Sequence, residues 1–184
     1  MKLNIGFFLG SKVGRGKNYS ALTKKVAKWI NLNRYNVIFG GTETGIMKDL
    51  VEGLDKRKLK VTAIITKSLL KDHNELEYYD ELIVTDDLNG RTEQFIQRSD
   101  FFLALPGGIG TLYEIIDILN KRVLAETSKK IFLINDFNYW NPLKLLLEHM
   151  IQEKFLNKGI LLENIKFINF DEFKERLKNV KDFS

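Results

Sequence analysis

Short apolar runs alternate along this chain with longer segments in which apolar residues recur every three or four positions. Runs of this length, rich in Val, Ile, Leu and Phe, are typical of strands that are buried on both faces of a parallel sheet. They fall at residues 3–9, 36–39, 61–66, 82–85, 101–105, 131–135 and 165–168. The intervening segments have helical periodicity. This order predicts one α/β domain over residues 1–184, a Rossmann-like, doubly wound parallel sheet with helices on both faces.

The periodic segments also predict which side of each helix enters the core. After residue 18, one face carries Leu22, Val26, Trp29 and Ile30. The helix that follows Pro142 is expected to bury four apolar side chains, those of Leu143, Leu146, Leu147 and Met150. Residues 67–80 are polar and are expected to form a short helix and a loop at the rim of the sheet. A final helix is expected from about residue 171 to residue 180.

The most informative stretch follows the apolar run 101–105 and reads Pro106-Gly107-Gly108-Ile109-Gly110-Thr111. Glycines let the backbone turn sharply and approach a ligand without a Cβ in the way. A helix that starts near Thr111 would aim its unpaired N–H groups at the same place. Alternatively, Thr111 and Glu114 form a capping box, in which each satisfies the other's backbone donor. A cap alone needs none of the three glycines, so the pattern favours a phosphate or nucleotide site formed by residues 107–111.

A second glycine-rich turn follows the run at 36–39 and contains Gly40, Gly41, Thr42 and Gly45. Turns at the carboxyl ends of parallel strands face the same crevice, so the two glycine turns are expected to contribute to one site. The first loop, residues 10–18, does not give the G-x-G-x-x-G fingerprint, and no acidic residue ends the second strand. NAD is therefore not expected. The basic side chains of this loop, Lys12, Arg15 and Lys17, meet either phosphate or solvent.

Arg91 stands out because of its position at the expected start of a helix, after the loop at residues 86–90. The helix dipole opposes a cation there. Functional sites are where such local preferences are broken, so we expect the guanidinium to have a role directed at a ligand.

Composition narrows the class of protein. With 184 residues and 44% hydrophobic content, the chain is long enough for one well-covered core. It has no cysteine and only two histidines, His73 and His149, so neither a disulfide nor a zinc cluster is expected. No segment reads as a signal peptide or membrane span, and we expect a cytoplasmic protein without a membrane partner. The net charge of +5 is scattered over the helices, so a nucleic-acid partner is not expected.

The central stretch, residues 106–114, resembles the P-G-G-x-G-T-x-x-E signature of the LOG family, the cytokinin riboside 5′-monophosphate phosphoribohydrolases often labelled lysine decarboxylases. The resemblance extends from about Leu3 to Leu156. Gly10 and Ser11 resemble the family's first-loop G-S, and Gly40 to Met47 resembles its G-G-G-x-x-G-L-M-G turn. Arg91 falls on the arginine of the M-H-x-R-K segment, and residues 136–143 resemble D-G-Y-Y-N-P-L.

This resemblance implies hydrolysis of the N-glycosidic bond of a purine or cytokinin riboside 5′-monophosphate, with Glu114 and Arg91 as catalytic residues and Gly10 and Ser11 added to the binding residues. The reaction passes through an oxocarbenium-like state, which a carboxylate beside the sugar stabilises. Arg91 would either neutralise the phosphate or hold Glu114 in position. Nothing singles out a lysine for a cofactor Schiff base, so no cofactor is expected.

Two further expectations complete the sequence-based picture. A phosphate cradle does not specify a reaction, so the alternative is a non-catalytic nucleotide sensor or a carrier of a phosphate-bearing cofactor. The apolar residues of the two helices around Arg91 and Glu114 exceed what one face of each helix needs, and the resemblance also implies a homodimer. These residues are Phe95, Ile96, Ile115, Ile116, Ile118 and Leu119. Burial of the same residues within one chain is the alternative.

Overall fold

The computed structural model describes residues 2–71, 78–159 and 164–178. Seven parallel strands form one sheet in the order β4-β3-β2-β1-β5-β6-β7. The strands are β1 (Asn4–Phe8), β2 (Asn36–Phe39), β3 (Val61–Thr66), β4 (Glu81–Thr85), β5 (Phe101–Ala104), β6 (Ile131–Ile134) and β7 (Ile165–Ile168). The predicted doubly wound parallel sheet is confirmed.

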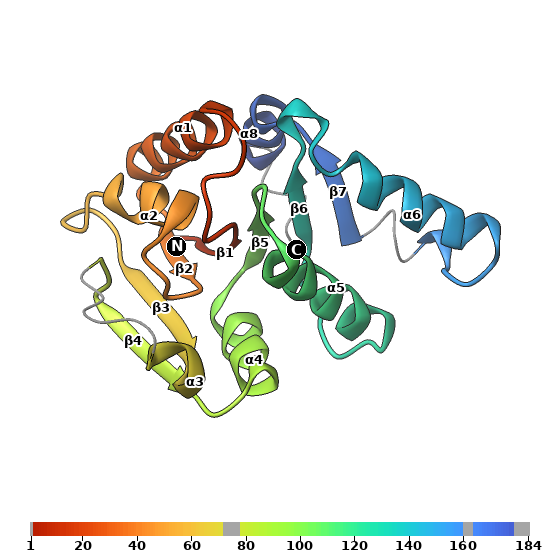
Figure 1. The fold of residues 1–184 in the computed structure, drawn as a ribbon, viewed down its shortest axis with the longest axis horizontal. Helices are drawn as coiled ribbons and strands as arrows, with labels where there is room; N and C mark the ends of the chain where they lie inside the picture. The colour runs from red at the N-terminus through yellow and green to blue at the C-terminus, as the bar shows by residue number, and fades with distance from the viewer. Residues whose placement is uncertain (1, 72–77, 160–163, 179–184) are drawn as a thin grey trace.

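Helices cover both faces of this sheet (Figure 1). They are α1 (Asn18–Asn33), α2 (Gly45–Glu52), α3 (Lys67–Leu70), α4 (Leu88–Arg98), α5 (Ile109–Val123), the 3-10 turn η1 (Asp136–Asn138), α6 (Asn141–Gln152) and α8 (Phe170–Lys178). The alternation of β1 shows how the layers are built, because successive side chains of a strand point to opposite faces. Phe7 packs in the core under α1, α2 and α8, whereas Phe8 packs in the core under α4, α5 and α6.

The strand order places the functional loops. From β1 the chain winds outward through β2, β3 and β4, and then returns to place β5 on the other side of β1. Phe8 at the end of β1 pairs in register with Ala104 at the end of β5. The order in which successive strands are added to the sheet therefore reverses between β1 and β5, and ligands of open α/β sheets bind at this switch point, outside the carboxyl ends of the strands. The glycine turn at residues 106–110 lies there.

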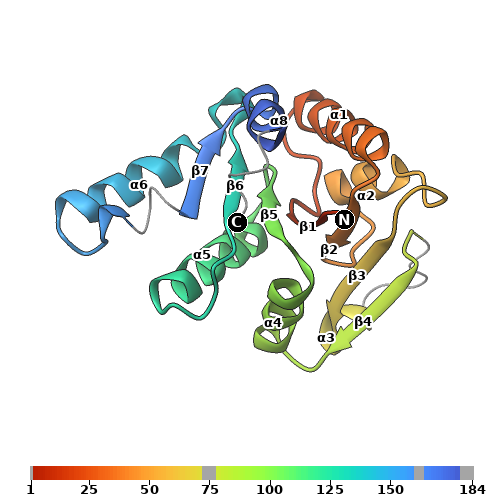
Figure 2. The same cartoon turned by 180° about the vertical axis from the view of Figure 1, so that it is seen from behind.

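Helix α6 differs from its prediction. Leu143 and Leu147 are buried as expected, but Leu146 is 50% exposed and Met150 is 36% exposed. Both views of the fold show α6 projecting beyond the sheet at one end (Figures 1 and 2). Only the narrow stripe through Leu143 and Leu147 therefore meets the core, and the expectation of a wide buried face was wrong.

The apolar residues of α4 and α5 follow the alternative that was left open, burial within one chain. Phe95, Ile115, Ile118 and Leu119 are buried within the chain, and only Ile116 of the expected set is markedly exposed, at 39%. Helix α5 lies over the centre of the sheet, where it packs against β1 and α4, so it needs a wider apolar face than a peripheral helix. These four residues therefore give no support for a dimer.

Two helix starts and one rim segment complete the comparison. Helix α4 begins at Leu88 and α5 begins at Ile109, each two or three residues before the predicted start. The rim segment contains the short helix α3, whereas residues 72–77 lie outside the described part of the chain. Among the described residues, no helix combines the length and apolar character needed to cross a bilayer.

Candidate functional site

A cavity of about 510 Å³ opens at the carboxyl ends of β1, β2 and β5. Its wall is formed by the loop after β1, the turn after β2, the glycine turn after β5, the start of α5, and side chains from α1, α2, α4 and the loop before α6. The lining residues are Leu9 to Gly14, Tyr19, Gly40, Thr42, Ile46, Met47, Leu69, Arg91, Pro106 to Thr111, Glu114 and Tyr139. Its position at the strand switch point agrees with the site predicted from the sequence.

Backbone contacts join the three turns into one unit. The N–H of Gly10 donates to the carbonyl of Pro106 at 3.1 Å, and the N–H of Met47 donates to the carbonyl of Gly10 at 3.2 Å. Gly45 has a φ of +58°, and a Cβ on it would lie 2.3 Å from the backbone nitrogen of Lys12. The first loop therefore lies directly on the start of α2, at a distance that only glycine permits.

The predicted binding residues divide into two groups. Gly10, Ser11, Gly40, Thr42 and residues 107–111 line the cavity, whereas Gly41 and Gly45 are not among its lining residues. Gly41 has a φ of +78°, and a Cβ there would lie 3.0 Å from Cβ of Ile65. Gly41 and Gly45 therefore allow the backbone conformation of the second turn without lining the cavity themselves.

The start of α5 shows that its glycines have different roles. A Cβ on Gly107 would lie 2.1 Å from Oγ1 of Thr111, so this glycine is required for close packing. A Cβ on Gly108 or Gly110 would meet no described atom within 4 Å, and both residues line the cavity. Gly107 therefore lets the turn close, and Gly108 and Gly110 leave space that a ligand can fill.

The capping-box alternative is wrong. The N-cap of α5 is Gly108, which has no side chain to act as a cap, and Thr111 is the third residue inside the helix. The first N–H groups of an α-helix have no partner within the helix, and the positive end of the helix dipole is at the same place. Because residues 108–111 line the cavity, this end of α5 is suited to bind an anion.

Glu114 and Arg91 meet in the wall of the cavity. Nη2 of Arg91 lies 2.9 Å from Oε1 of Glu114, and both side chains are nearly buried, with exposed fractions of 11% and 12%. The guanidinium also donates from Nε to the carbonyl of Ile64 at 3.0 Å and from Nη2 to the carbonyl of Gly40 at 3.4 Å. A Cβ on Gly40 would lie 2.5 Å from Nη2, so Gly40 is the residue that leaves room for Arg91.

This geometry bears on the two roles left open for Arg91. Arg91 is in the first turn of α4, near the helix N-terminus where the dipole opposes a cation. Its guanidinium lies 5.4 Å from the ring centre of Phe95. The side chain runs inward to two carbonyl groups and to Glu114. Among the described residues, the anionic partner of Arg91 is Glu114.

The surroundings of Glu114 alter its acidity. Burial raises the pKa of Glu114 to about 7, while the charge and hydrogen bond of Arg91 act in the opposite direction and limit the rise. A carboxyl group with this pKa changes its charge near neutral pH. Groups whose pKa is shifted in this way are concentrated at functional sites.

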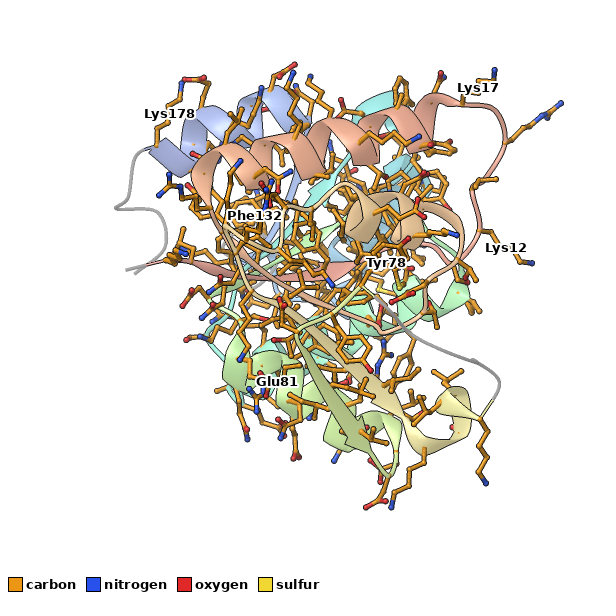
Figure 3. The ribbon with its side chains drawn as sticks, turned by 90° about the vertical axis from the view of Figure 1, so that its left-hand side faces the viewer. Lys12, Lys17, Tyr78, Glu81, Phe132 and Lys178 are labelled. Carbon is orange, nitrogen blue, oxygen red and sulfur yellow. The ribbon has the colours of Figure 1, made fainter. Side chains whose placement is uncertain are left out.

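Two tyrosines that the sequence did not predict line the cavity, together with Lys12, one of the basic residues of the first loop. The rings of Tyr19 and Tyr139 pack edge to face with centres 5.5 Å apart, and the hydroxyl of Tyr139 donates to the carbonyl of Gly107. Tyr139 lies in residues 136–143, which resemble the D-G-Y-Y-N-P-L stretch of the LOG family, but the sequence alone predicts no role for its side chain. Lys12 lines the cavity, and its side chain extends outward from the same loop as that of Lys17 (Figure 3).

Two aspartates, Asp100 just before β5 and Asp87 at the start of α4, accept hydrogen bonds from the backbone. Oδ2 of Asp100 accepts a hydrogen bond from the N–H of Asn4 at 2.7 Å, and Oδ1 of Asp87 accepts from the N–H of Gly90 at 2.8 Å, as the N-cap of α4. Among the described residues, no three His, Asp or Glu side chains come together as metal ligands would. Glu114 is the carboxylate of the described cavity wall.

Relatives with known names share much of this chain. A cytokinin riboside 5′-monophosphate phosphoribohydrolase of Arabidopsis thaliana is 29% identical over 81% of this chain, and the match covers 65% of that protein. A probable enzyme of the same name from Oryza sativa subsp. japonica is 28% identical, again over 81% of this chain, and the match covers 61% of it. The enzyme of that name from Rhodococcoides fascians is 29% identical over 83% of this chain and 78% of its own length.

Solved structures share the fold. The molybdenum cofactor binding protein of Rippkaea orientalis superposes with a TM-score of 0.67 at 22% identity, over 98% of each chain. The molybdenum cofactor carrier protein of Chlamydomonas reinhardtii gives a TM-score of 0.58 at 19% identity, over 73% of this chain and 77% of that one. Residues 47–178, which run from α2 to α8, match a protein-family model. The chain therefore belongs to the family described as "Possible lysine decarboxylase", as the resemblance of its central stretch indicated.

Proposed function

We propose that this protein hydrolyses the N-glycosidic bond of a purine or cytokinin riboside 5′-monophosphate to the free base and ribose 5-phosphate. One observation carries the proposal: a nearly buried carboxylate, Glu114, is held at 2.9 Å by Arg91 inside a cavity whose rim is the open start of α5. The named phosphoribohydrolases, at 25–29% identity, support the same reaction.

The cavity separates a phosphate end from a sugar end. The phosphate binds to the N–H groups at the start of α5, beside Gly108 and Gly110, where helix dipole and empty space coincide. Glu114 lies four residues further along α5 than Gly110, which is about 6 Å along the helix axis. The ribose of a 5′-monophosphate extends from its phosphate on this scale, so the carboxylate lies beside the sugar.

Glu114 then acts on the sugar carbon. As the bond between C1′ and the base breaks, positive charge develops on the ribose, and the carboxylate stabilises it. Water attacks C1′, its oxygen forms the new bond, and Glu114 accepts the proton that this water loses. The base leaves with the electrons of the broken bond and takes up one proton from solvent, and Glu114 then releases its proton to solvent, so that one water is consumed overall. Arg91 keeps the carboxylate oriented towards the cavity through its bonds to Ile64 and Gly40.

The test is to incubate the pure protein with a panel of nucleoside 5′-monophosphates and separate the products by chromatography. Release of free base together with ribose 5-phosphate is expected. Glu114→Ala is expected to reduce the rate by a factor on the order of 100 or more, with nucleotide binding retained, because it removes the group that stabilises the charge. Absence of base release, under conditions where a related phosphoribohydrolase works, would remove the proposal. Calorimetric binding of nucleotide without turnover would instead favour the sensor or carrier.

We also propose a homodimer, on different residues from those predicted. Helix α6 and the segment just after it expose an apolar surface formed by Leu145, Leu146, Met150 and Phe155, with exposed fractions of 65%, 50%, 36% and 88%. Leu146 and Met150 are four residues apart and therefore share one face of α6, and exposed apolar surface on one face is characteristic of protein interfaces. Light scattering or sedimentation tests the proposal, and a monomer at all concentrations would contradict it.

A further inference from the structure

Tyr139 makes a contact that the proposed reaction does not yet use. Its hydroxyl donates a hydrogen bond to the carbonyl of Gly107, and both residues line the cavity. Gly107 directly precedes Gly108, the N-cap of α5, so the bonded carbonyl belongs to the peptide that enters the anion-binding end of the helix.

The chemistry of this peptide makes its orientation important. The peptide is trans, so the carbonyl oxygen of Gly107 and the N–H of Gly108 point in opposite directions. One edge of the peptide attracts an anion and the other edge repels it. A peptide between two glycines also rotates more easily than others, because neither flanking residue has a Cβ to restrict its dihedral angles. Something must therefore choose which edge faces the bound phosphate.

Tyr139 is itself well fixed. Its ring packs edge to face on Tyr19, with centres 5.5 Å apart, and on Trp140, with centres 4.9 Å apart. The backbone N–H of Trp140 donates to Oδ1 of Asn135 at 2.7 Å, which anchors the loop to the end of β6. The two residues before Tyr139 are in the left-handed region, with φ of +63° at Phe137 and +58° at Asn138. Phe137 is unusual there, since a bulky side chain makes this region costly.

We propose that Tyr139 is a positioning residue for the phosphate end of the site. By holding the carbonyl of Gly107, it keeps that oxygen away from the anion and fixes the Gly108 N–H on the opposite edge of the peptide. The residue acts on affinity for the phosphate group and leaves the sugar chemistry of Glu114 unchanged. The inference rests on the proposed function for its substrate, and on the geometry of the turn for its mechanism.

The test uses two probes, inorganic phosphate and adenosine 5′-monophosphate. The nucleotide is used for binding and, over a range of concentrations, for turnover. Tyr139→Phe removes only the hydroxyl. The expected result is a roughly three- to tenfold weaker binding of both anions by calorimetry, the range that one hydrogen bond's net contribution supports. In turnover, KM for the nucleotide is expected to rise by the same factor with kcat unchanged, because the phosphate contact is made equally in ground and transition states.

A matched control removes the same atom elsewhere. Tyr35 follows the C-terminal end of α1, and its ring centre lies 5.1 Å from that of Trp29. The Tyr35→Phe variant is expected to bind phosphate as the unaltered protein does. A Tyr139→Phe variant that binds both anions as well as the control does would overturn the inference. A fall in kcat without a rise in KM would also overturn it, because that result assigns the hydroxyl to the chemical step or to the fold.

A second measurement needs no variant. Addition of inorganic phosphate to isotopically labelled protein is expected to shift the amide resonance of Gly108 strongly, and an unmoved resonance at saturating phosphate contradicts the inference. The two proposals fail separately. Weaker phosphate binding in Tyr139→Phe without any base release by the unaltered protein supports the role of Tyr139 and removes the hydrolase. Base release by the unaltered protein, together with unchanged phosphate binding in Tyr139→Phe, supports the hydrolase and removes the role of Tyr139.

Discussion

At the scale of single residues, the charge state of Glu114 sets the expected pH dependence of activity. Burial raises the pKa of Glu114 to about 7, and the carboxylate is the form that stabilises positive charge on the ribose. We therefore expect kcat/KM for a nucleoside 5′-monophosphate to rise from pH 5 to pH 8 with a midpoint near 7. A phosphate monoester itself titrates near pH 6, so the substrate is titrated separately and its contribution removed. A profile that is flat from pH 5 to pH 8 after this correction would contradict the assigned role.

The ion pair also predicts how stability depends on pH. Replacing Arg91 by Ala leaves the carboxylate of Glu114 nearly buried without its partner, which typically costs about 3–5 kcal/mol in the free energy of unfolding. Arg91 lowers the pKa of Glu114, so in the variant that pKa rises further. At pH 5.5 the carboxyl group is then protonated and uncharged. The destabilisation is expected to be clearly larger at pH 8.5 than at pH 5.5 in urea unfolding.

The sign follows from proton linkage. The folded protein holds the Glu114 proton more tightly than the unfolded chain does, so its contribution to stability is fully present below about pH 4.5 and is lost as the pH rises through the folded pKa. The double variant Arg91→Ala with Glu114→Gln has no titrating carboxyl at this position and serves as the control. Equal destabilisation by Arg91→Ala at both pH values, or an unchanged pH dependence in the double variant, would contradict this account.

At the scale of elements, the turn before α5 offers a pair of glycines with opposite expectations. Gly107→Ala places a Cβ 2.1 Å from Oγ1 of Thr111, so the turn must open and the variant is expected to lose about 1–3 kcal/mol of stability, as overpacked sites do. Gly108→Ala meets no described atom within 4 Å, and its φ of −90° suits alanine. This variant is expected to unfold at nearly the same urea concentration as the unaltered protein, yet to bind phosphate more weakly because the methyl group enters the cavity.

The measurements are urea unfolding and phosphate calorimetry on both variants. Gly107→Ala is the one that should move the unfolding midpoint, and Gly108→Ala is the one that should move phosphate affinity at an unchanged midpoint. The reverse assignment, with a stable Gly107→Ala, would show that the turn adapts and that the close contact with Thr111 is not required.

The same turn shows why sequence reasoning reached some features of the site and missed others. Three glycines before a helix predicted a turn that lines a cavity, because strand, turn and helix are adjacent in the chain, and phosphate binding by this turn stays a prediction. The choice between cap and cradle depended on where α5 begins, and two residues of error made Thr111 look like a cap. Tyr139 lies 32 residues beyond Gly107, and local pattern holds no information about a hydrogen bond between them.

At the scale of the whole molecule, the sheet was predictable because most strands are short apolar runs that alternate with helical segments, the pattern typical of a parallel sheet covered on both faces. The depth of burial on helices was less predictable. Leu146 and Met150 carry the same periodic pattern as Leu143 and Leu147, but α6 extends past the edge of the sheet, where no described element covers them. Amphipathicity shows that a face is apolar and gives no information on what covers it. The cytoplasmic location stays a prediction from the sequence.

The exposed surface of α6 leads to a prediction for the assembly. Leu146→Lys adds a charge at a side chain that is 50% exposed, so in a monomer it should change the unfolding free energy by no more than about 0.5 kcal/mol. In a dimer that buries this surface, association would remove the lysine ammonium from water without giving it an ionic partner. The cost of this desolvation is expected to dissociate the variant. Leu32→Lys on α1 is the matched control, because Leu32 is 75% exposed on a helix that covers the other face of the sheet.

Sedimentation and thermal unfolding over a range of protein concentrations distinguish the two cases. For the unaltered protein and for Leu32→Lys we expect the mass of a dimer and a Tm that rises with concentration, because association stabilises only the folded chain. For Leu146→Lys we expect the mass of a monomer and a Tm independent of concentration. If all three proteins sediment alike as monomers, α6 is exposed in solution. If all three remain dimers, the two chains meet through a surface other than the exposed face of α6, and the proposed role of α6 is contradicted.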